Sequence, residues 1–121
     1  MEDEDPLTRK VIGAAFAVSR ALGHGFLETV YKNALRVELV AAGSTVTTEK
    51  AFPVSYRGEQ VGTYIADLLV DDRLIVEVKT VESLGAAHSA QLLNYLKASG
   101  IGLGLLLNFG KPRIEVKRIA L

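Results

Sequence analysis

Apolar residues recur at helical spacing in the N-terminal third of the chain, in two runs separated by a glycine turn. The first run begins at Asp5-Pro6, where Asp can accept from free first-turn N–H groups and Pro loses nothing at the first helical position. Its buried stripe, which ends before Gly23, consists of Leu7, Val11, Ala14, Val18 and Leu22. A second helical pattern runs from about Leu27 to Ala42, and Gly43 ends it. The pattern predicts a helical hairpin.

After Gly43 the hydrophobic period changes to the alternation that is typical of strands. Polar turn residues divide this region into three predicted strands of an antiparallel meander, over 45–56, 61–70 and 73–80. A further helix is predicted over 83–98, where Gly100 ends it. The run 101–107 is apolar at every position, as expected for a strand covered on both faces. A last alternating strand is predicted over 113–119.

The order ααβββαββ predicts an α/β domain of the α+β, mixed-sheet kind, with helices packed on a central sheet. The helix over 83–98 crosses over to a strand that can lie parallel to its neighbour. A chain of 121 residues with 49% hydrophobic residues supplies one core. We therefore expect a single domain over residues 1–121.

Composition restricts the function classes. The 14 Lys and Arg residues balance 14 Asp and Glu residues, so the chain lacks the basic excess that many nucleic-acid binders carry. The absence of cysteine excludes disulfides, thiolate zinc sites and cysteine nucleophiles. The N-terminus is acidic where a secretory signal is basic, and the longest apolar run is too short to span a bilayer. We expect a soluble cytoplasmic protein with no membrane partner.

Candidate chemistry lies in two of the predicted strands. The period of two places Glu77 and Lys79 on one face of their strand, while Leu74, Val76 and Val78 take the other. Asp67 lies in the preceding strand among apolar residues, where a carboxylate is costly unless something pairs with it. A metal ion or the Lys79 ammonium would provide this partner.

The spacing of the two acidic residues makes a geometric prediction. Ten positions separate Asp67 from Glu77, an even number. Directly opposed residues of an antiparallel hairpin share a face, and opposing these two requires an odd number of loop residues or a bulge. We therefore predict a three-residue loop over 71–73, or a bulge between the two acidic positions. A two-residue turn would send Glu77 to the other face.

Two carboxylates and a backbone carbonyl suit a hard, oxygen-preferring ion such as Mg²⁺, which can activate a water for attack on phosphorus. Lys79 could position that water or offset charge in the transition state. The alternative from spacing alone is a cross-strand salt bridge, with Asp67 as a solvated edge residue.

Three motifs in order resemble a known family. Asp67 followed by Glu77-Val78-Lys79 resembles the signature of the PD-(D/E)XK nuclease superfamily, although Ala66 stands where the superfamily name has proline. The segment from Gly25 to Tyr31 resembles the motif that names the GxxExxY family, a group placed in that superfamily. The segment from Gln91 to Tyr95 is similar to the QxxxY motif of exonucleases related to RecB.

The resemblance implies a two-layer nuclease core that binds Mg²⁺ or Mn²⁺ and cuts nucleic acid, with DNA favoured over RNA. It also implies roles for individual residues. The implied metal ligands are Asp67, Glu77, the Val78 carbonyl and Glu28, and the implied catalytic residues are Lys79, Glu77, Asp67 and Glu28. The implied substrate-binding residues, one helical turn apart, are Gln91 and Tyr95, which would contact the nucleic-acid backbone or orient Lys79.

Other interpretations remain open. Glu28 is also suited to a first helical turn and to an ion pair with Lys32, and Tyr31 is typical of a core tyrosine with its hydroxyl satisfied. The zero net charge is compatible with a non-catalytic module that binds nucleic acid or protein on the nuclease fold. An interaction protein that pairs through a free sheet edge at 101–107, and a homodimer, are further alternatives.

Overall fold

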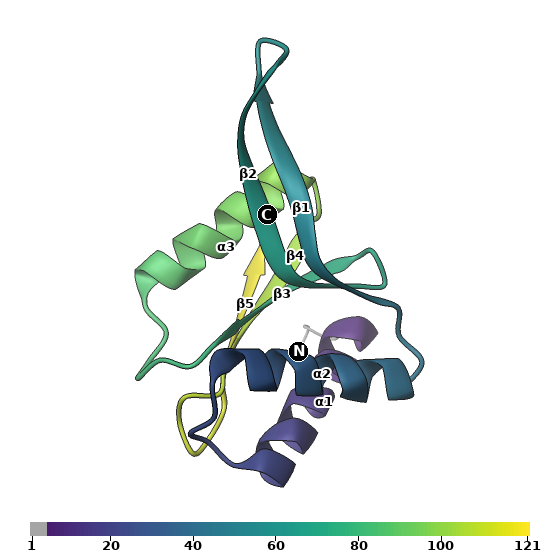
Figure 1. The fold of residues 1–121 in the computed structure, drawn as a ribbon, viewed down its shortest axis with the longest axis vertical. Coiled ribbons are helices and arrows are strands. Elements are labelled where there is room, and N and C mark those ends of the chain that lie inside the picture. Colours follow the sequence, from purple (N-terminus) through teal and green to yellow (C-terminus); the bar gives the residue numbers. More distant parts are fainter. Residues whose placement is uncertain (1–4) are drawn as a thin grey trace.

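The computed structural model describes residues 5–121 as three helices packed on a five-stranded sheet (Figure 1). The elements in chain order are α1 (Pro6–Leu22), α2 (Glu28–Ala41), β1 (Val46–Tyr56), β2 (Glu59–Val70), β3 (Leu74–Lys79), α3 (Ala86–Ser99), β4 (Leu103–Asn108) and β5 (Glu115–Ala120). The predicted order ααβββαββ is confirmed, with bounds that differ by a few residues.

Local sequence explains how the first helix begins and ends. The Thr8 N–H donates to Asp5 Oδ2 at 2.9 Å, and Pro6 occupies the first helical position. At the other end Gly23 adopts a φ of 72°, a conformation that side chains disfavour. The predicted stripe is buried along α1 up to Val18, and Leu22 is partly buried, which confirms the helix and its inward face.

The sheet has the order β1-β2-β3-β4-β5, and all neighbours are antiparallel except β3 and β4. Helix α3 makes the crossover between these two parallel strands, as predicted. Strand β4 therefore lies inside the sheet, between β3 and β5. The expectation of a free edge at 101–107 is wrong, because β5 pairs with the side of β4 that the crossover leaves open.

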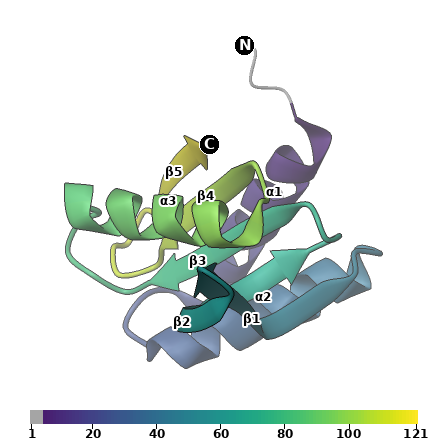
Figure 2. The ribbon, with the colours of Figure 1, turned by 90° about the horizontal axis from the view of Figure 1, so that it is seen from above.

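Two hydrophobic cores lie on opposite faces of the sheet. Figure 2 shows α3 and α2 on opposite sides of the strands. The larger core joins α1 and α2 to alternate residues of β2, β3 and β4. The smaller core joins α3 to residues of the same strands that face the opposite side of the sheet. The domain thus has three layers where the resemblance implied two. The reason is that α3 buries its own face, with Leu92, Tyr95 and Leu96, against the second side of the sheet.

Candidate active site

The β2–β3 ladder is short, and it ends at the two predicted acidic residues. Paired positions run from Val70 opposite Leu74 to Leu68 opposite Val76, a register that brings Asp67 opposite Glu77. There side chains replace main-chain bonds: Glu77 Oε2 accepts from the Asp67 N–H at 2.9 Å, and Asp67 Oδ2 accepts from the Val78 N–H at 2.8 Å. The predicted three-residue loop over 71–73 is confirmed.

Beyond this point the β1–β2 hairpin leaves β3 and projects from the body of the domain (Figure 1). The side-chain alternation of β2 is interrupted here, because Leu68 lies in the larger core and Ala66 lies in the smaller one. Glu49 of β1, which the register brings opposite Asp67, has a φ of 53°. A left-handed residue other than glycine is strained, and such strain clusters at functional sites.

Glu77 is the buried acid of the site, with 3% of its surface exposed. Burial, and next the charge of Asp67, raise its pKa to about 8. The Asp67 N–H and the ammonium groups of Lys79 and Lys32 act in the opposite direction without cancelling this effect. At neutral pH the metal-free protein therefore favours the protonated form of Glu77.

Lys79 and helix α3 meet over the carboxylates. Lys79 Nζ donates to Gln91 Oε1 at 3.3 Å, and a role for Gln91 in orienting the lysine stays a prediction. Tyr95, one turn further along, is buried and packs edge-on against Tyr64 with ring centroids 5.1 Å apart. Burial, then the charges of Glu77 and Asp67, raise the pKa of Tyr95 to about 12. Its hydroxyl therefore stays protonated beside the acidic pair, available as a donor.

A second lysine, which the sequence analysis treated only as a partner of Glu28, belongs to the site. Lys32 of α2 lies 3.7 Å from Asp67 Oδ1 and also forms an ion pair with Glu49 Oε2. The hydrogen bond to Glu49 raises the pKa of Lys32, and the charges of Asp67 and Glu28 act in the same direction. No sequence signal marks Lys32 or Glu49, because their meeting joins residues of a helix and two strands.

Glu28, the first residue of α2, is exposed. Within residues 5–121, no three acidic, histidine or cysteine side chains are grouped so that they could hold a metal ion. The expected convergence of Glu28 with Asp67 and Glu77 is thus not seen, and its role stays a prediction. The neighbouring Tyr31 is a core residue, as interpreted: its hydroxyl donates to the Gly23 carbonyl at 2.6 Å, and its ring stacks on Phe109.

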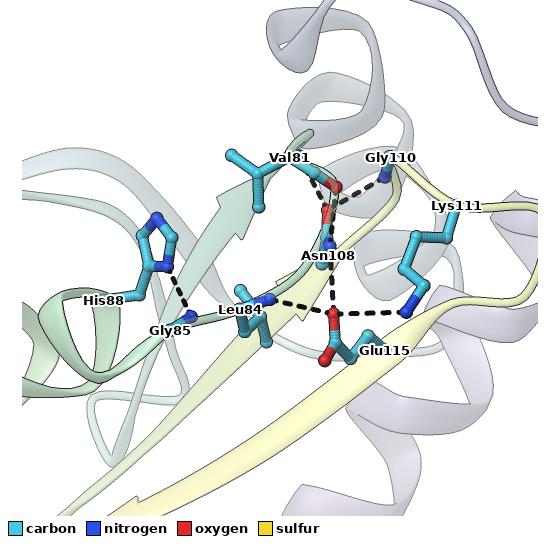
Figure 3. Close-up of polar contacts among 8 residues, drawn as sticks. All are labelled: Val81, Leu84, Gly85, His88, Asn108, Gly110, Lys111 and Glu115. Atoms are coloured by element: carbon cyan, nitrogen blue, oxygen red, sulfur yellow. Dashed lines mark hydrogen bonds and ion pairs between the residues drawn. The ribbon is translucent and has the colours of Figure 1, made fainter.

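The segment that links Lys79 to α3 is held by a buried polar network (Figure 3). Asn108, opposite Lys79 in the parallel ladder, is fully buried; its amide accepts from the Val81 N–H and donates to the Val81 carbonyl, both at 2.9 Å. Glu115 Oε1 accepts from Asn108 Nδ2 and from the Leu84 N–H. This network keeps the linker out of α3, which begins at Ala86 and not at Ser83 as predicted.

At the end of this linker, His88 Nδ1 accepts from the Gly85 N–H at 2.9 Å (Figure 3). His88 therefore closes the first turn of α3. Lys111 lies 3.9 Å from Glu115 Oε1 and so joins the Asn108–Glu115 network. The linker and both ends of the Lys79–Gln91 contact are thereby fixed to the body of the sheet.

The residues present fit a hard divalent cation. Asp67 and Glu77 offer oxygen ligands in one place, and the buried Glu77 carboxyl resists a second negative charge beside Asp67. A cation between them would offset both the burial and the repulsion. Oxygen donors of this kind are those that Mg²⁺ and Mn²⁺ prefer.

A comparison with solved structures supports the fold. Among solved structures, the chain is similar to the protein in "Crystal structure of SSO0001", with a TM-score of 0.61 over 94% of this chain at 20% identity. The chain spans 58% of the length of that protein. No curated protein matches the chain.

In the part of the chain that the structure describes, no helix has both the length and the apolar character needed to cross a membrane.

A family model described as the PD-(D/E)XK nuclease superfamily matches residues 5–119. This match takes in Asp67, Glu77 and Lys79, and it covers nearly the whole fold. The chain belongs to the PD-(D/E)XK nuclease superfamily.

Proposed function

We propose that this protein is a metal-dependent nuclease that hydrolyses phosphodiester bonds of nucleic acid, with DNA favoured over RNA. The observation that carries the proposal is the meeting of Asp67, Glu77 and Lys79 where the β2–β3 ladder ends. Superfamily membership supports a nuclease-type function in general. The motif from Gly25 to Tyr31 supports placement in the GxxExxY family.

The resident metal in this proposal is Mg²⁺ or Mn²⁺, held by Asp67, Glu77 and the Val78 carbonyl, with Glu28 as a further ligand directly or through water. When bound, such an ion supplies an activated water and offsets charge on the phosphoryl oxygens. The chain's own contribution is an acidic pair whose buried member, Glu77, is costly to ionise without a cation.

Lys79 supplies positive charge and hydrogen bonds toward a phosphoryl oxygen, where they stabilise the transition state. Gln91 limits the rotation of the Lys79 ammonium through the 3.3 Å contact. The Tyr95 hydroxyl is protonated near the same carboxylates and acts as a donor to the substrate backbone.

The test is cleavage of assorted DNA and RNA in Mg²⁺ or Mn²⁺ by the wild type and by Lys79→Ala. We expect cleavage by the wild type and a loss of about 100-fold or more in the variant, as for other transition-state donors. Lys117→Ala, an exposed lysine of β5, serves as the matched control and should cleave like the wild type. Absence of cleavage on every substrate by folded, metal-loaded protein would refute the proposal.

The second candidate is a non-catalytic module that binds nucleic acid or protein. It is favoured by Lys32, whose ammonium lies 3.7 Å from Asp67 Oδ1 and offsets the charge that would attract a metal ion. The zero net charge of the chain also favours it. Nucleic-acid binding without cleavage in any divalent ion would support it. The nuclease proposal also includes three expectations: a cytoplasmic location, a single domain and a homodimer. Light scattering, which measures the molecular mass in solution, tests the homodimer.

A further inference from the structure

A cavity of about 240 Å³ lies between the β1–β2 hairpin and α3. Its walls are Val54 and Tyr64 from the hairpin and Asn94, Lys97 and Ala98 from the helix. Its volume is below the range of about 300–1,000 Å³ that drug-sized ligands occupy. The cavity therefore suits one small, compact group.

The cavity adjoins the acidic site through an aromatic contact. The ring of Tyr64 lies against Tyr95, and the charges of Glu77 and Asp67 act on the Tyr95 hydroxyl. Along α3, the cavity residue Ala98 follows Gln91 by seven positions, which corresponds to about 10 Å of helix. A polymer bound at the carboxylates could thus reach the cavity along the same face.

The lining combines a half-buried aromatic ring and apolar walls with two polar groups. The Asn94 amide can both donate and accept, and Lys97 is an exposed ammonium at the same cavity. A flat aromatic molecule with polar edges and an attached anion matches all of these features. A nucleobase with its phosphate is such a molecule, since every base has a face that stacks on aromatic side chains.

We propose that this cavity holds one unpaired nucleobase of the substrate strand. Tyr64 contacts the face of the base, Asn94 bonds to its edge, and Lys97 pairs with a neighbouring phosphate. The inference rests on the proposed function and makes it more specific. A base inside a duplex is stacked on both sides and must leave the stack to enter a pocket, so the substrate class is single-stranded or frayed nucleic acid.

Affinity for a short single strand and for a blunt duplex of the same sequence tests the inference. Fluorescence anisotropy is measured in Ca²⁺, with the oligonucleotides checked for integrity afterwards. The variants are Tyr64→Leu, which removes the ring, and Ala98→Met, which fills the cavity with a good helix former. Ala21→Met, the same substitution at an exposed position of α1, is the control.

We expect both cavity variants to bind the single strand about tenfold more weakly, in the range for loss of one base–aromatic contact. Duplex affinity, the melting temperature of Ala98→Met and all properties of Ala21→Met should be nearly unchanged. Single-strand affinity equal to that of the wild type, or an equal loss for both substrates, would overturn the inference.

Cleavage in Mg²⁺ separates this inference from the proposed function. A wild type that cleaves, with cavity variants that bind single strands normally, overturns the inference alone. If the wild type never cleaves, but Ala98→Met binds the single strand more weakly than the wild type does, the proposed base site is supported and the proposed nuclease function is overturned. Failure of the wild type to bind any nucleic acid overturns both.

Discussion

At the residue scale, the chemistry of the site depends on Glu77, a carboxyl that is buried beside another carboxyl. Its pKa is raised in the folded chain from an ordinary 4.5 to about 8. Because the raised pKa belongs to the folded state, the folded chain binds more protons between these values than the unfolded chain does. The contribution of Glu77 to stability is therefore fully present below pH 4.5 and is lost as the pH rises through 8.

The raised pKa of Glu77 predicts how the stability of the metal-free protein depends on pH. The melting temperature in a chelator should fall, between about pH 4.5 and 8, more steeply for the wild type than for Glu77→Gln. The variant keeps the shape of the side chain but has no charge to bury. Mg²⁺ should raise the melting temperature of the wild type, most strongly near pH 8, and have little effect on the variant. Parallel pH curves for the two proteins would contradict the buried charge.

Lys32 supplies the other residue-scale prediction. Its ammonium neutralises part of the charge that a divalent ion would meet at Asp67. Lys32→Met should therefore tighten Mn²⁺ binding by about fivefold to tenfold, while lowering the metal-free melting temperature. Calorimetric titration of metal measures the effect without recourse to activity. Lys117→Met is the control, and weaker Mn²⁺ binding by Lys32→Met would show that the lysine assists the metal instead of competing with it.

At the scale of elements, the end of β4 holds the active-site segments together. Asn108 fixes the linker to α3, the Phe109 N–H donates to the Lys79 carbonyl at 2.8 Å, and Phe109 stacks on Tyr31 at the start of α2. Gly110 follows in such close contact that a Cβ there would lie 2.5 Å from the Val81 carbonyl oxygen. These consecutive residues thus contact β3, the linker that leads to α3, and α2.

Gly110→Ala should destabilise the protein by about 1–3 kcal/mol, the usual cost of overpacking, because the contacting atoms are backbone and cannot rotate away. Gly102→Ala is the matched control, since a Cβ at that position meets nothing within 4 Å. Urea unfolding of both variants measures the difference. Equal stability of the two would mean that the linker yields easily, contrary to its network of hydrogen bonds.

The contact between β3 and α3 makes a prediction about catalysis. If Gln91 acts by orienting Lys79, Gln91→Ala should lower kcat by about tenfold in the wild type and by little in Lys79→Ala. A double-mutant cycle on kcat measures this coupling. Independent, multiplicative losses would instead assign Gln91 a separate contact with the substrate.

At the scale of the whole molecule, zero net charge conflicts with a polyanionic substrate. Basic residues must then gather on the face of the site. The register places Lys50 opposite Ala66 of the α3 core, and Lys97 lines the cavity, so both join Lys79 on that face. Lys111 instead pairs with Glu115 in the linker network.

A few lysines neutralise only a few phosphates, so the salt dependence of binding should be shallow. We expect a slope of about −2 or shallower for the logarithm of the binding constant against the logarithm of salt concentration, measured on a single strand in Ca²⁺. A homodimer would double the footprint and steepen the slope. A steep slope from a monomer would mean that more basic residues contact the substrate than these three.

Part of the site follows from local rules that can be applied to the amino-acid sequence alone. The period of two placed Glu77 and Lys79 on one face, and Asp5-Pro6 indicated where α1 begins. For Asp67 and Glu77 to lie opposite each other, their spacing allowed either a loop over 71–73 or a bulge, and the loop is the one that forms. Each of these is settled by residues close in the chain, where backbone geometry leaves few choices.

Contacts between distant segments depend instead on how the helices and strands pack. The Lys32–Glu49 pair joins α2 to β1, Asn108 bonds to a linker 27 positions earlier, and the cavity forms because the β1–β2 hairpin leaves β3 beside α3. The exposure of Glu28 also depends on how α2 packs. The physical reason is that periodicity assigns a side chain to a face of its own element, whereas the packing of elements decides which faces meet and at what distance.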